Sequence, residues 1–103
     1  MLDLMNSESD YVNYYCSKWR GQIEYRLPDR TRVDCLTEKQ AIEFDWCKKW
    51  AEGIGQALYY SKMTGKAPTV ALICKKSEQR FIDRIKKAAP EIELIIITNK
   101  TTN

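Results

Sequence analysis

The stretch that decides the fold is AIEFDWCKKWAEGIGQALYY, residues 41–60. Its first half alternates bulky apolar side chains with acids, which are Ile42, Phe44 and Trp46 against Glu43 and Asp45. This two-residue alternation predicts a β-strand whose two faces differ in chemistry. The second half has apolar residues at helical spacing, so a helix is predicted over residues 47–63. A strand running directly into a helix is typical of an α/β fold.

The flanking sequence extends this pattern in both directions. Upstream, the predicted elements are a helix capped by Ser7 or Ser9 and ending at about Lys18, and alternating strands over residues 21–27 and 31–37. Downstream, Gly65 is the expected helix C-cap. The later elements are a buried strand over residues 69–74, an amphipathic helix over residues 77–89 capped by Ser77, and a buried strand over residues 91–98.

The predicted order is α-β-β-β-α-β-α-β, which indicates an α/β fold in one domain spanning residues 1–103, with residues 1–6 and 99–103 frayed. A meander of three strands followed by two helical crossovers implies a mixed central sheet, because crossover strands run parallel to their neighbours. Helices then cover both faces. A domain of 103 residues has little stability to spare, so a homodimer or a protein partner is one expectation.

Composition limits the reactions and the partners that can be expected of the chain. The chain has 17 Lys and Arg against 14 Asp and Glu, and this net charge of +3 permits a polyanionic partner without arguing for one. It contains no histidine, which excludes Ser-His-Asp and Cys-His catalysis within the chain. No segment approaches the roughly 20 apolar residues that cross a membrane, and the N-terminus lacks the features of a secretory signal. No membrane association is therefore expected.

Four cysteines are scattered along the chain: Cys16, Cys35, Cys47 and Cys74. They form no C-x-x-C pair, and no histidine is present to complete a mixed zinc site. Cys35 and Cys74 lie in apolar, strand-like runs. The expectation is four free, buried thiols in a reducing compartment, which places the protein in the cytoplasm.

The acids of the opening stretch form a candidate metal site. Glu43 and Asp45 point to the same face of their strand, roughly 6–7 Å apart. If residues 31–37 and 40–46 pair as a hairpin, Asp34 lies beside Glu43. Like charges at this distance repel, and a hard divalent cation such as Mg²⁺ removes that penalty and can activate water for phosphodiester cleavage. The alternative is that these acids form the solvated face of an antiparallel strand.

The helix after the acidic strand adds polar groups. Lys49, Gly53, Gln56 and Tyr60 follow helical spacing, which places them along one stripe. Lys49 is one turn from the acidic strand end and is placed to reach a phosphate, while Gln56 and Tyr60 offer polar groups further along. The alternative is a solvated helix face, with glycines that allow close helix–sheet packing.

Asp34 on one strand, Glu43-Phe44-Asp45 on the next, and a helix carrying Gln56-x-x-x-Tyr60 together resemble the PD-(D/E)XK nuclease superfamily. The element order resembles its restriction-endonuclease-like core, and the helix motif is similar to that of RecB-like exonucleases. The resemblance covers residues 7–98. It implies a Mg²⁺- or Mn²⁺-dependent nuclease acting on nucleic acid, with DNA favoured over RNA. It also implies that Asp34 and Glu43 are metal ligands, with the Phe44 carbonyl as a third.

Two positions depart from the family pattern. Asp45 stands where the family usually has lysine, and Val33 stands where it usually has proline. One possibility is that Asp45 is a further metal ligand or a water-orienting base. A second is that the role of the lysine passes to Lys49, or less favourably to Lys48, on the following helix. A third possibility is that the domain no longer cleaves.

The family often adds an N-terminal glutamate to the site. Glu24, on the polar side of the first strand, is the first candidate for it, with Glu8 behind it.

Three functional hypotheses follow: a Mg²⁺-dependent nuclease-like domain, a catalytically inactive domain of the same fold that binds nucleic acid or protein, and a small α/β interaction protein whose acids are only surface.

Overall fold

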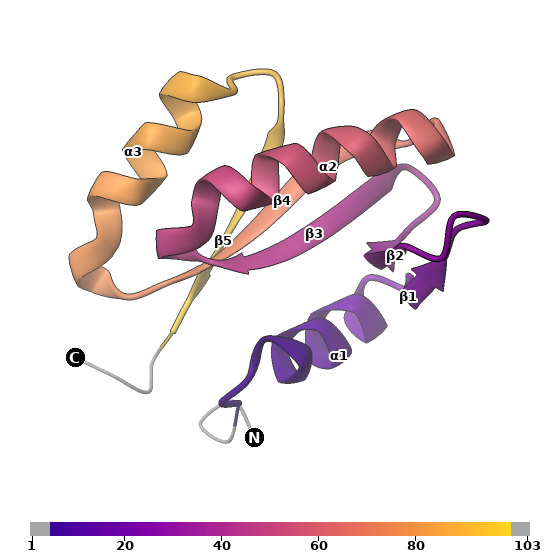
Figure 1. The fold of residues 1–103 in the computed structure, drawn as a ribbon. Coiled ribbons are helices and arrows are strands. Elements are labelled where there is room, and N and C mark those ends of the chain that lie inside the picture. The colour runs from indigo at the N-terminus through magenta and orange to yellow at the C-terminus, as the bar shows by residue number, and fades with distance from the viewer. Residues whose placement is uncertain (1–4, 100–103) are drawn as a thin grey trace.

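The computed structural model describes residues 5–99, which form three α-helices and a five-stranded sheet (Figure 1). Their bounds are α1 Glu8–Lys18, β1 Gln22–Arg26, β2 Arg32–Leu36, β3 Gln40–Trp46, α2 Trp50–Thr64, β4 Ala67–Cys74, α3 Gln79–Ala88 and β5 Glu93–Thr98. Short 3-10 turns lead into the last two helices, η2 at Cys47–Lys49 before α2 and η3 at Lys76–Glu78 before α3. The predicted α/β class is confirmed.

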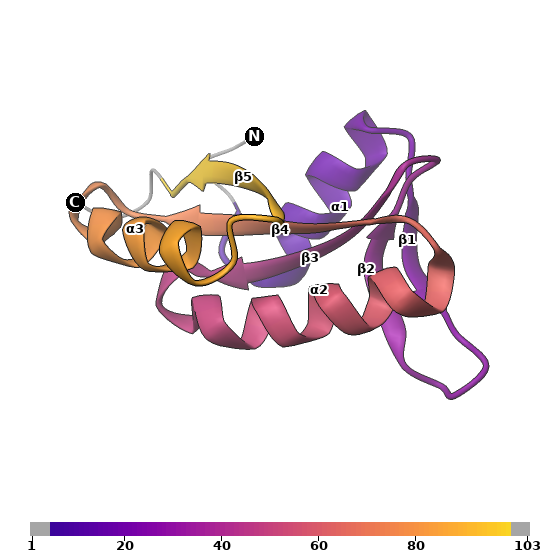
Figure 2. The same cartoon turned by 90° about the horizontal axis from the view of Figure 1, so that it is seen from above.

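The sheet has the strand order β1-β2-β3-β4-β5, so each strand lies beside its neighbour in sequence. The pairs β1–β2 and β2–β3 are antiparallel, and β3–β4 and β4–β5 are parallel. Helix α1 covers one face, and α2 and α3 cover the other (Figures 1 and 2). The predicted mixed sheet with helices on both faces is therefore confirmed.

Alternation along β3 and β4 separates two cores. The α1 side is filled by Tyr11, Val12, Cys16, Ile42, Phe44, Ala71, Ile73 and Ile97 among others. The side of α2 and α3 is filled by Ala57, Val70, Leu72, Ile82, Ile85 and Ile92 among others. Because β4 is buried on both faces, its sequence reads as a continuous apolar run, as a central parallel strand should.

Strands β2 and β3 separate soon after they pair. Their paired residues are Cys35 with Ile42 and Leu36 with Ala41. Beyond that point β3 continues to pair with β4 on its other side, through Trp46. The side of β3 that carries residues 43–46 therefore opens toward a gap, and this gap holds the predicted acids.

Helix ends match the sequence signals in part. Ser7 caps α1 as predicted, since its Oγ accepts a hydrogen bond from the Asp10 N–H at 3.2 Å and the Asp10 carboxylate accepts one from the Ser7 N–H at 3.1 Å. Gly65 ends α2 with φ +73°, also as predicted. Ser77 does not cap α3, so that prediction is wrong. The turn before α3 is closed by Glu78, whose Oε1 accepts from the backbone N–H of residue 75 at 2.9 Å.

The cysteines correct the sequence expectation. Two disulfides, Cys16–Cys35 and Cys47–Cys74, pair all four thiols. The prediction of free thiols was wrong because the partners lie 19 and 27 residues apart, and sequence spacing does not reveal which cysteines the fold brings together. The expectation of a reducing compartment rested on those free thiols, so it loses its basis.

The ends of the described chain are held in place. Met5 is buried, and the Asn6 N–H donates to the Asp10 carboxylate at 3.0 Å. The Asn99 N–H donates to the Cys74 carbonyl at 2.8 Å. Fraying was predicted for residues 1–6 and 99–103, and it stays a prediction, because these contacts do not test it. Residues 1–4 and 100–103 lie outside the described residues. None of the described helices is both long enough and apolar enough to span a membrane.

Candidate functional site

The gap between β2 and β3 is bridged by two acids. The Asp34 Oδ2 atom accepts a hydrogen bond from the Phe44 N–H at 2.9 Å, and the Glu43 Oε1 atom accepts one from the Asp34 N–H at 3.2 Å. Each carboxylate thus accepts from a backbone N–H of the opposite strand, in place of the backbone carbonyl that would accept if the strands stayed paired. The sequence register had placed Asp34 beside Glu43, and the structure brings them together.

Asp45 and Glu8 extend the group on one side. Asp45 is two residues beyond Glu43 on β3 and is only 6% exposed, and its Oδ2 atom has no hydrogen-bond partner within residues 5–99. The charge of the Glu8 carboxyl, from the first turn of α1, helps to raise the pKa of Asp45. We refer to Glu8, Asp34, Glu43 and Asp45 as the acidic cluster.

Burial and mutual repulsion raise the pKa values of the cluster. Burial, together with the charge of Asp34, raises the pKa of Glu43 to about 9. Burial likewise raises the pKa of Asp45 to about 7, helped by the charges of Glu8 and Glu52, and that of Asp34 to about 6. Burial also raises the pKa of Glu8. Near neutral pH the cluster therefore retains protons that an incoming cation would displace.

Helix α2 approaches the cluster through a glycine. A Cβ atom at Gly53 would lie 3.2 Å from the Asp45 Oδ2 atom and 3.3 Å from the Val70 Cγ1 atom. Only glycine therefore fits here without displacing a neighbour. About two helical turns further along α2, Tyr60 is buried, and burial with the nearby charges of Glu43 and Asp34 raises the pKa of its phenol.

The predicted Lys-Gly-Gln-Tyr stripe is split by the packing of α2. Gly53 and Tyr60 face the sheet and are buried, whereas Lys49 and Gln56 are exposed. Lys49 lies near the Glu8 side of the cluster, where its charge counteracts part of the rise in the pKa of Glu8. The structure thus places one cation at the rim of the acids and leaves Gln56 on the solvent side of the helix.

Glu24 lies on the other side of Asp34. The β1–β2 register pairs Ile23 with Cys35 and Tyr25 with Val33, which sets Glu24 across from Asp34. Its φ of +55° is in the left-handed region, which is unusual for a residue with a side chain. Its carboxylate pairs with Arg32 at 3.3 Å and is exposed, so Glu24 reaches Asp34 only through the field of its charge.

Two acids contribute more than the sequence analysis assigned to them. Glu8 interacts directly with Asp45, although Glu24 had been ranked ahead of it. Glu52, which was not singled out, raises the pKa values of both Asp45 and Glu8. Its position one helical turn after Lys49, directly behind the acidic strand, was a usable signal.

The acidic cluster does not form a ready-made metal site within the described residues. Within residues 5–99, no group of three or more His, Cys, Asp and Glu side chains is arranged to hold a metal ion. However, Mg²⁺ is usually bound by one or two carboxylates, with waters and substrate phosphate completing its shell. The partnerless Asp45 Oδ2 atom fits such an ion, because a buried carboxylate oxygen without a donor is costly.

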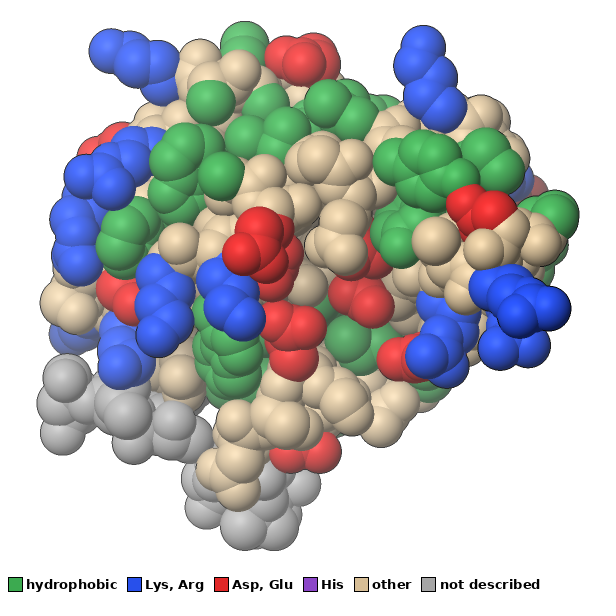
Figure 3. All heavy atoms as spheres, in the orientation of Figure 1, with side chains coloured by type: hydrophobic (Ala, Val, Ile, Leu, Met, Phe, Trp, Pro, Cys, Tyr) green, Lys and Arg blue, Asp and Glu red, His purple; other side chains and the backbone are tan. Residues whose placement is uncertain are grey.

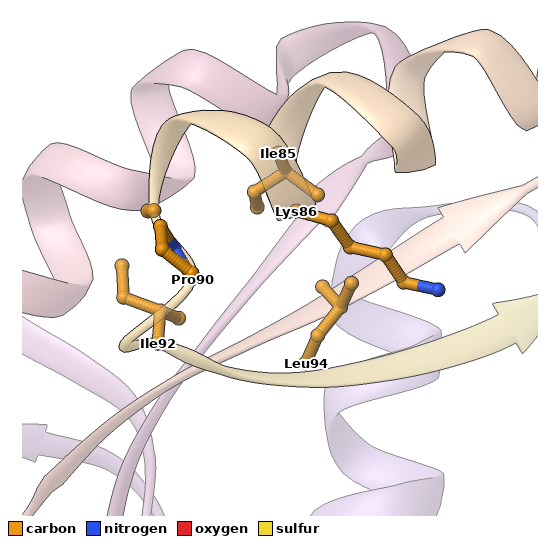
Figure 4. Close-up of a pocket in the computed structure, with 6 residues that line it drawn as sticks. Ile85, Lys86, Pro90, Ile92 and Leu94 are labelled. Atoms are coloured by element: carbon orange, nitrogen blue, oxygen red, sulfur yellow. The ribbon is translucent and has the colours of Figure 1, made fainter.

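The face of the molecule shown in Figure 3 carries both acidic and basic side chains. In the view of Figure 3, acidic side chains gather near the middle of the face, with lysines and arginines on both sides. The hollow between α3 and β5 in Figure 4, about 210 Å³, is a different place with a mainly apolar lining that includes Ile85, Ile92 and Leu94. No protein-family model, curated protein or solved structure matches the chain.

Proposed function

We propose that the chain is a Mg²⁺-dependent nuclease-like domain of the PD-(D/E)XK kind, which cleaves phosphodiester bonds in nucleic acid, with DNA favoured over RNA. The observation that carries this proposal is the buried, partnerless Asp45 Oδ2 atom inside a cluster of acids with raised pKa values. Structural surface acids are normally solvated or paired, whereas the Asp45 Oδ2 atom is buried and has no hydrogen-bond partner within residues 5–99.

The cluster supplies the groups such a reaction needs. Asp34, Glu43 and Asp45 would hold Mg²⁺ or Mn²⁺, with the Phe44 carbonyl as a further oxygen ligand. The bound ion supplies a Lewis acid that activates water and offsets the negative charge of the phosphate. The two hydrogen bonds across the β2–β3 gap fix the orientation of Asp34 and Glu43 before any ion arrives.

The other residues take roles that follow from their exposure. Lys49, at the rim, would stabilise negative charge on the phosphate in the transition state. Gln56, exposed on α2, would contact the nucleic-acid backbone. Tyr60 is buried beside Glu43, so its role here is to position that carboxylate rather than to touch the phosphate.

A second candidate function is a catalytically inactive domain of this fold that binds nucleic acid or protein. It is favoured by one specific observation: an acid, Asp45, occupies the position where the family's lysine is expected. If the exposed Lys49 does not replace that lysine, the domain binds metal and substrate without cleaving.

A nuclease assay with metal titration tests the proposal. We expect the wild type to bind Mn²⁺ and to cleave at least one of duplex DNA, single-stranded DNA and RNA. Glu43→Gln should lose metal binding, and Lys49→Ala should bind metal but cleave roughly 100-fold or more slowly. Glu38→Gln, which makes the same change at an exposed site in the turn between β2 and β3, should behave as wild type.

The outcomes separate the two candidates. Metal binding that depends on Glu43, without cleavage of any of the three substrates, would support the inactive domain. Absence of both metal binding and cleavage would sink the nuclease proposal.

A further inference from the structure

A row of four basic side chains runs along the outer side of α3 and the turn before it: Lys76, Arg80, Arg84 and Lys87, all exposed. Their spacing of four, four and three residues keeps them on one side of the helix. The opposite side carries Ile82, Ile85 and Ala89, which are buried against the sheet. We refer to these four cations as the basic row.

The basic row lacks neutralising partners. Within residues 5–99 the only ion pair joins Arg32 to Glu24, and these residues belong to strands β2 and β1 rather than to α3. Asp83 lies one helical turn from both Arg80 and Lys87 and offsets part of this charge, but its carboxylate accepts from the Gln79 side-chain amide at 3.0 Å and Glu78 accepts from a backbone N–H, so neither acid forms an ion pair with the row. Like charges one helical turn apart repel by about 0.2–0.5 kcal/mol per pair, and an anion bound along the row would remove that cost.

Two of the cations are ordered by an aromatic ring. The Arg80 guanidinium carbon lies 4.3 Å from the centroid of the Phe81 ring, and that of Arg84 lies 5.4 Å from it. Stacking on a ring restricts the rotamers of both arginines, so less entropy is lost when they bind. Arginine also presents a planar fork of donors that suits phosphate oxygens.

The row begins at the turn that touches η2, the segment that follows the acidic strand β3. Strands β3 and β4 are parallel, so η2 and η3 leave the sheet at the same end, and they touch where Cys47 Sγ lies 3.7 Å from the Glu78 carbonyl oxygen. A hollow of about 290 Å³ lies at this junction, and its lining includes Lys48 and Lys75. Figure 3 shows basic side chains continuing from the acids toward the side of α3.

We propose that the basic row binds successive phosphates of a nucleic-acid backbone whose neighbouring phosphate reaches the acidic cluster. From Arg80 to Lys87 the helix rises about 10 Å. A DNA strand carries one phosphate per roughly 3.4 Å of duplex axis, and because the phosphates also wind round that axis, a straight row of this length meets about two of them. Lys86 is outside the row, because it lines the apolar hollow of Figure 4. The place of the scissile phosphate rests on the proposed function, whereas backbone binding by the row needs no metal.

Binding measured in EDTA tests the row without cleavage. Labelled duplex DNA, single-stranded DNA and RNA would each be titrated by fluorescence anisotropy from about 50 to 200 mM salt, where phosphate contacts dominate the salt dependence. For the best-bound form, Arg80→Gln/Arg84→Gln should lower the slope of log K against log salt by about 2, and affinity by roughly tenfold or more. Arg80→Lys/Arg84→Lys should restore most of the slope.

The matched control is Lys39→Gln/Lys62→Gln. It makes the same change in net charge with two exposed lysines: Lys39 immediately precedes β3, and Lys62 is in the last turn of α2. We expect its salt slope and affinity to equal those of wild type. Circular dichroism and thermal melting of each variant confirm that the fold is retained, as expected for exposed side chains.

Three results would overturn the proposal: no binding of any nucleic acid at 50 mM salt, equal losses in both double variants, or tighter binding of poly-glutamate than of nucleic acid, which would indicate an acidic protein partner. Failure here is distinct from failure of the proposed function. Metal-dependent cleavage that is insensitive to Arg80→Gln/Arg84→Gln would reject the role of the basic row and leave the nuclease proposal standing. Nucleic-acid binding that persists in EDTA, in a protein with no affinity for Mn²⁺, would reject the nuclease proposal and leave the role of the basic row standing.

Discussion

Three carboxyl groups, Asp34, Glu43 and Asp45, bind protons more tightly in the folded chain than in the unfolded one. In the metal-free protein, the free energy of unfolding should therefore fall as pH rises. The decline begins near pH 4, about the ordinary pKa of these groups. It continues toward the raised pKa of Glu43, which is about 9. Glu43→Gln is neutral at every pH and keeps an acceptor for the Asp34 N–H. We expect it to flatten the decline above pH 7, as measured by urea unfolding across this range.

Glu38→Gln is the control for that measurement, because Glu38 is exposed and should leave the pH dependence of wild type intact. Parallel curves for wild type and Glu43→Gln would show that Glu43 is already ionised at neutral pH in the folded protein. That outcome would contradict the raised pKa and weaken the case for a cation at this place.

Metal binding should run opposite to this pH trend. A divalent cation binds the ionised carboxylates, so Mn²⁺ should release protons on binding and raise the melting temperature more at pH 8 than at pH 5.5. Calorimetry in two buffers with different ionisation enthalpies measures the protons released. A stabilisation that is equal at both pH values would mean that the ion binds elsewhere.

At the residue level, the sequence predicted local neighbours well and tertiary neighbours poorly. Asp34 and Glu43 could be paired because a short hairpin gap sets their register. Glu8 could not be ranked first, because its contact with Asp45 depends on how α1 packs against the end of β3. Nothing in local spacing encodes that docking.

The two glycines of α2 offer a comparison at the level of one element. An alanine at Gly55 would meet nothing within 4 Å, so Gly55→Ala should stabilise the protein by about 0.5–1 kcal/mol through helix propensity. At Gly53 the same methyl group would press on Asp45 and Val70. We expect Gly53→Ala to lose that gain and to weaken Mn²⁺ binding, as measured by urea unfolding and metal titration.

Gly55→Ala serves as the matched control, since both changes add one methyl group to the same helix. If Gly53→Ala were as stabilising as Gly55→Ala and bound Mn²⁺ normally, the close approach of α2 to β3 would have no role in the site. The expected difference comes from contacts with the sheet, because the intrinsic preference of the helix is the same at both positions.

Elements were predictable where a single periodicity ran without interruption. Strand β3 and helix α2 follow from residues 41–60, but the 3-10 turn at residues 47–49 does not, because the helical pattern continues through it. The separation of β2 from β3 was also missed. The alternation in both strands is compatible with a full hairpin, and only the bonds from Asp34 and Glu43 across the gap show where pairing stops.

The molecule as a whole depends on covalent links that the sequence analysis did not foresee. Cys16–Cys35 ties α1 to β2, and Cys47–Cys74 ties η2 to the end of β4. Each link therefore fastens an element that carries a member of the acidic cluster or leads directly from it. The positions of the cysteines in apolar runs indicated burial correctly, but pairing is a property of the three-dimensional fold.

Reduction of these disulfides should cost much of the domain's stability. The partners are separated by 19 and 27 residues. Chain-entropy arguments assign about 3 kcal/mol to loops of that length. Small domains are stable by only about 5–15 kcal/mol. We expect Cys16→Ala/Cys35→Ala and Cys47→Ala/Cys74→Ala each to lower the free energy of unfolding by about 3 kcal/mol in urea titrations.

Wild type in a strong phosphine reductant should then approach the stability of a variant that lacks all four cysteines, and that variant should ignore the reductant. Thiol titration of the denatured, unreduced wild type supplies the direct check, since paired cysteines leave no reactive thiol. Four reactive thiols per chain in that titration would contradict the pairing. In that case α1 and η2 would be held at the acidic cluster by side-chain packing alone, because no covalent link would fasten them to the sheet.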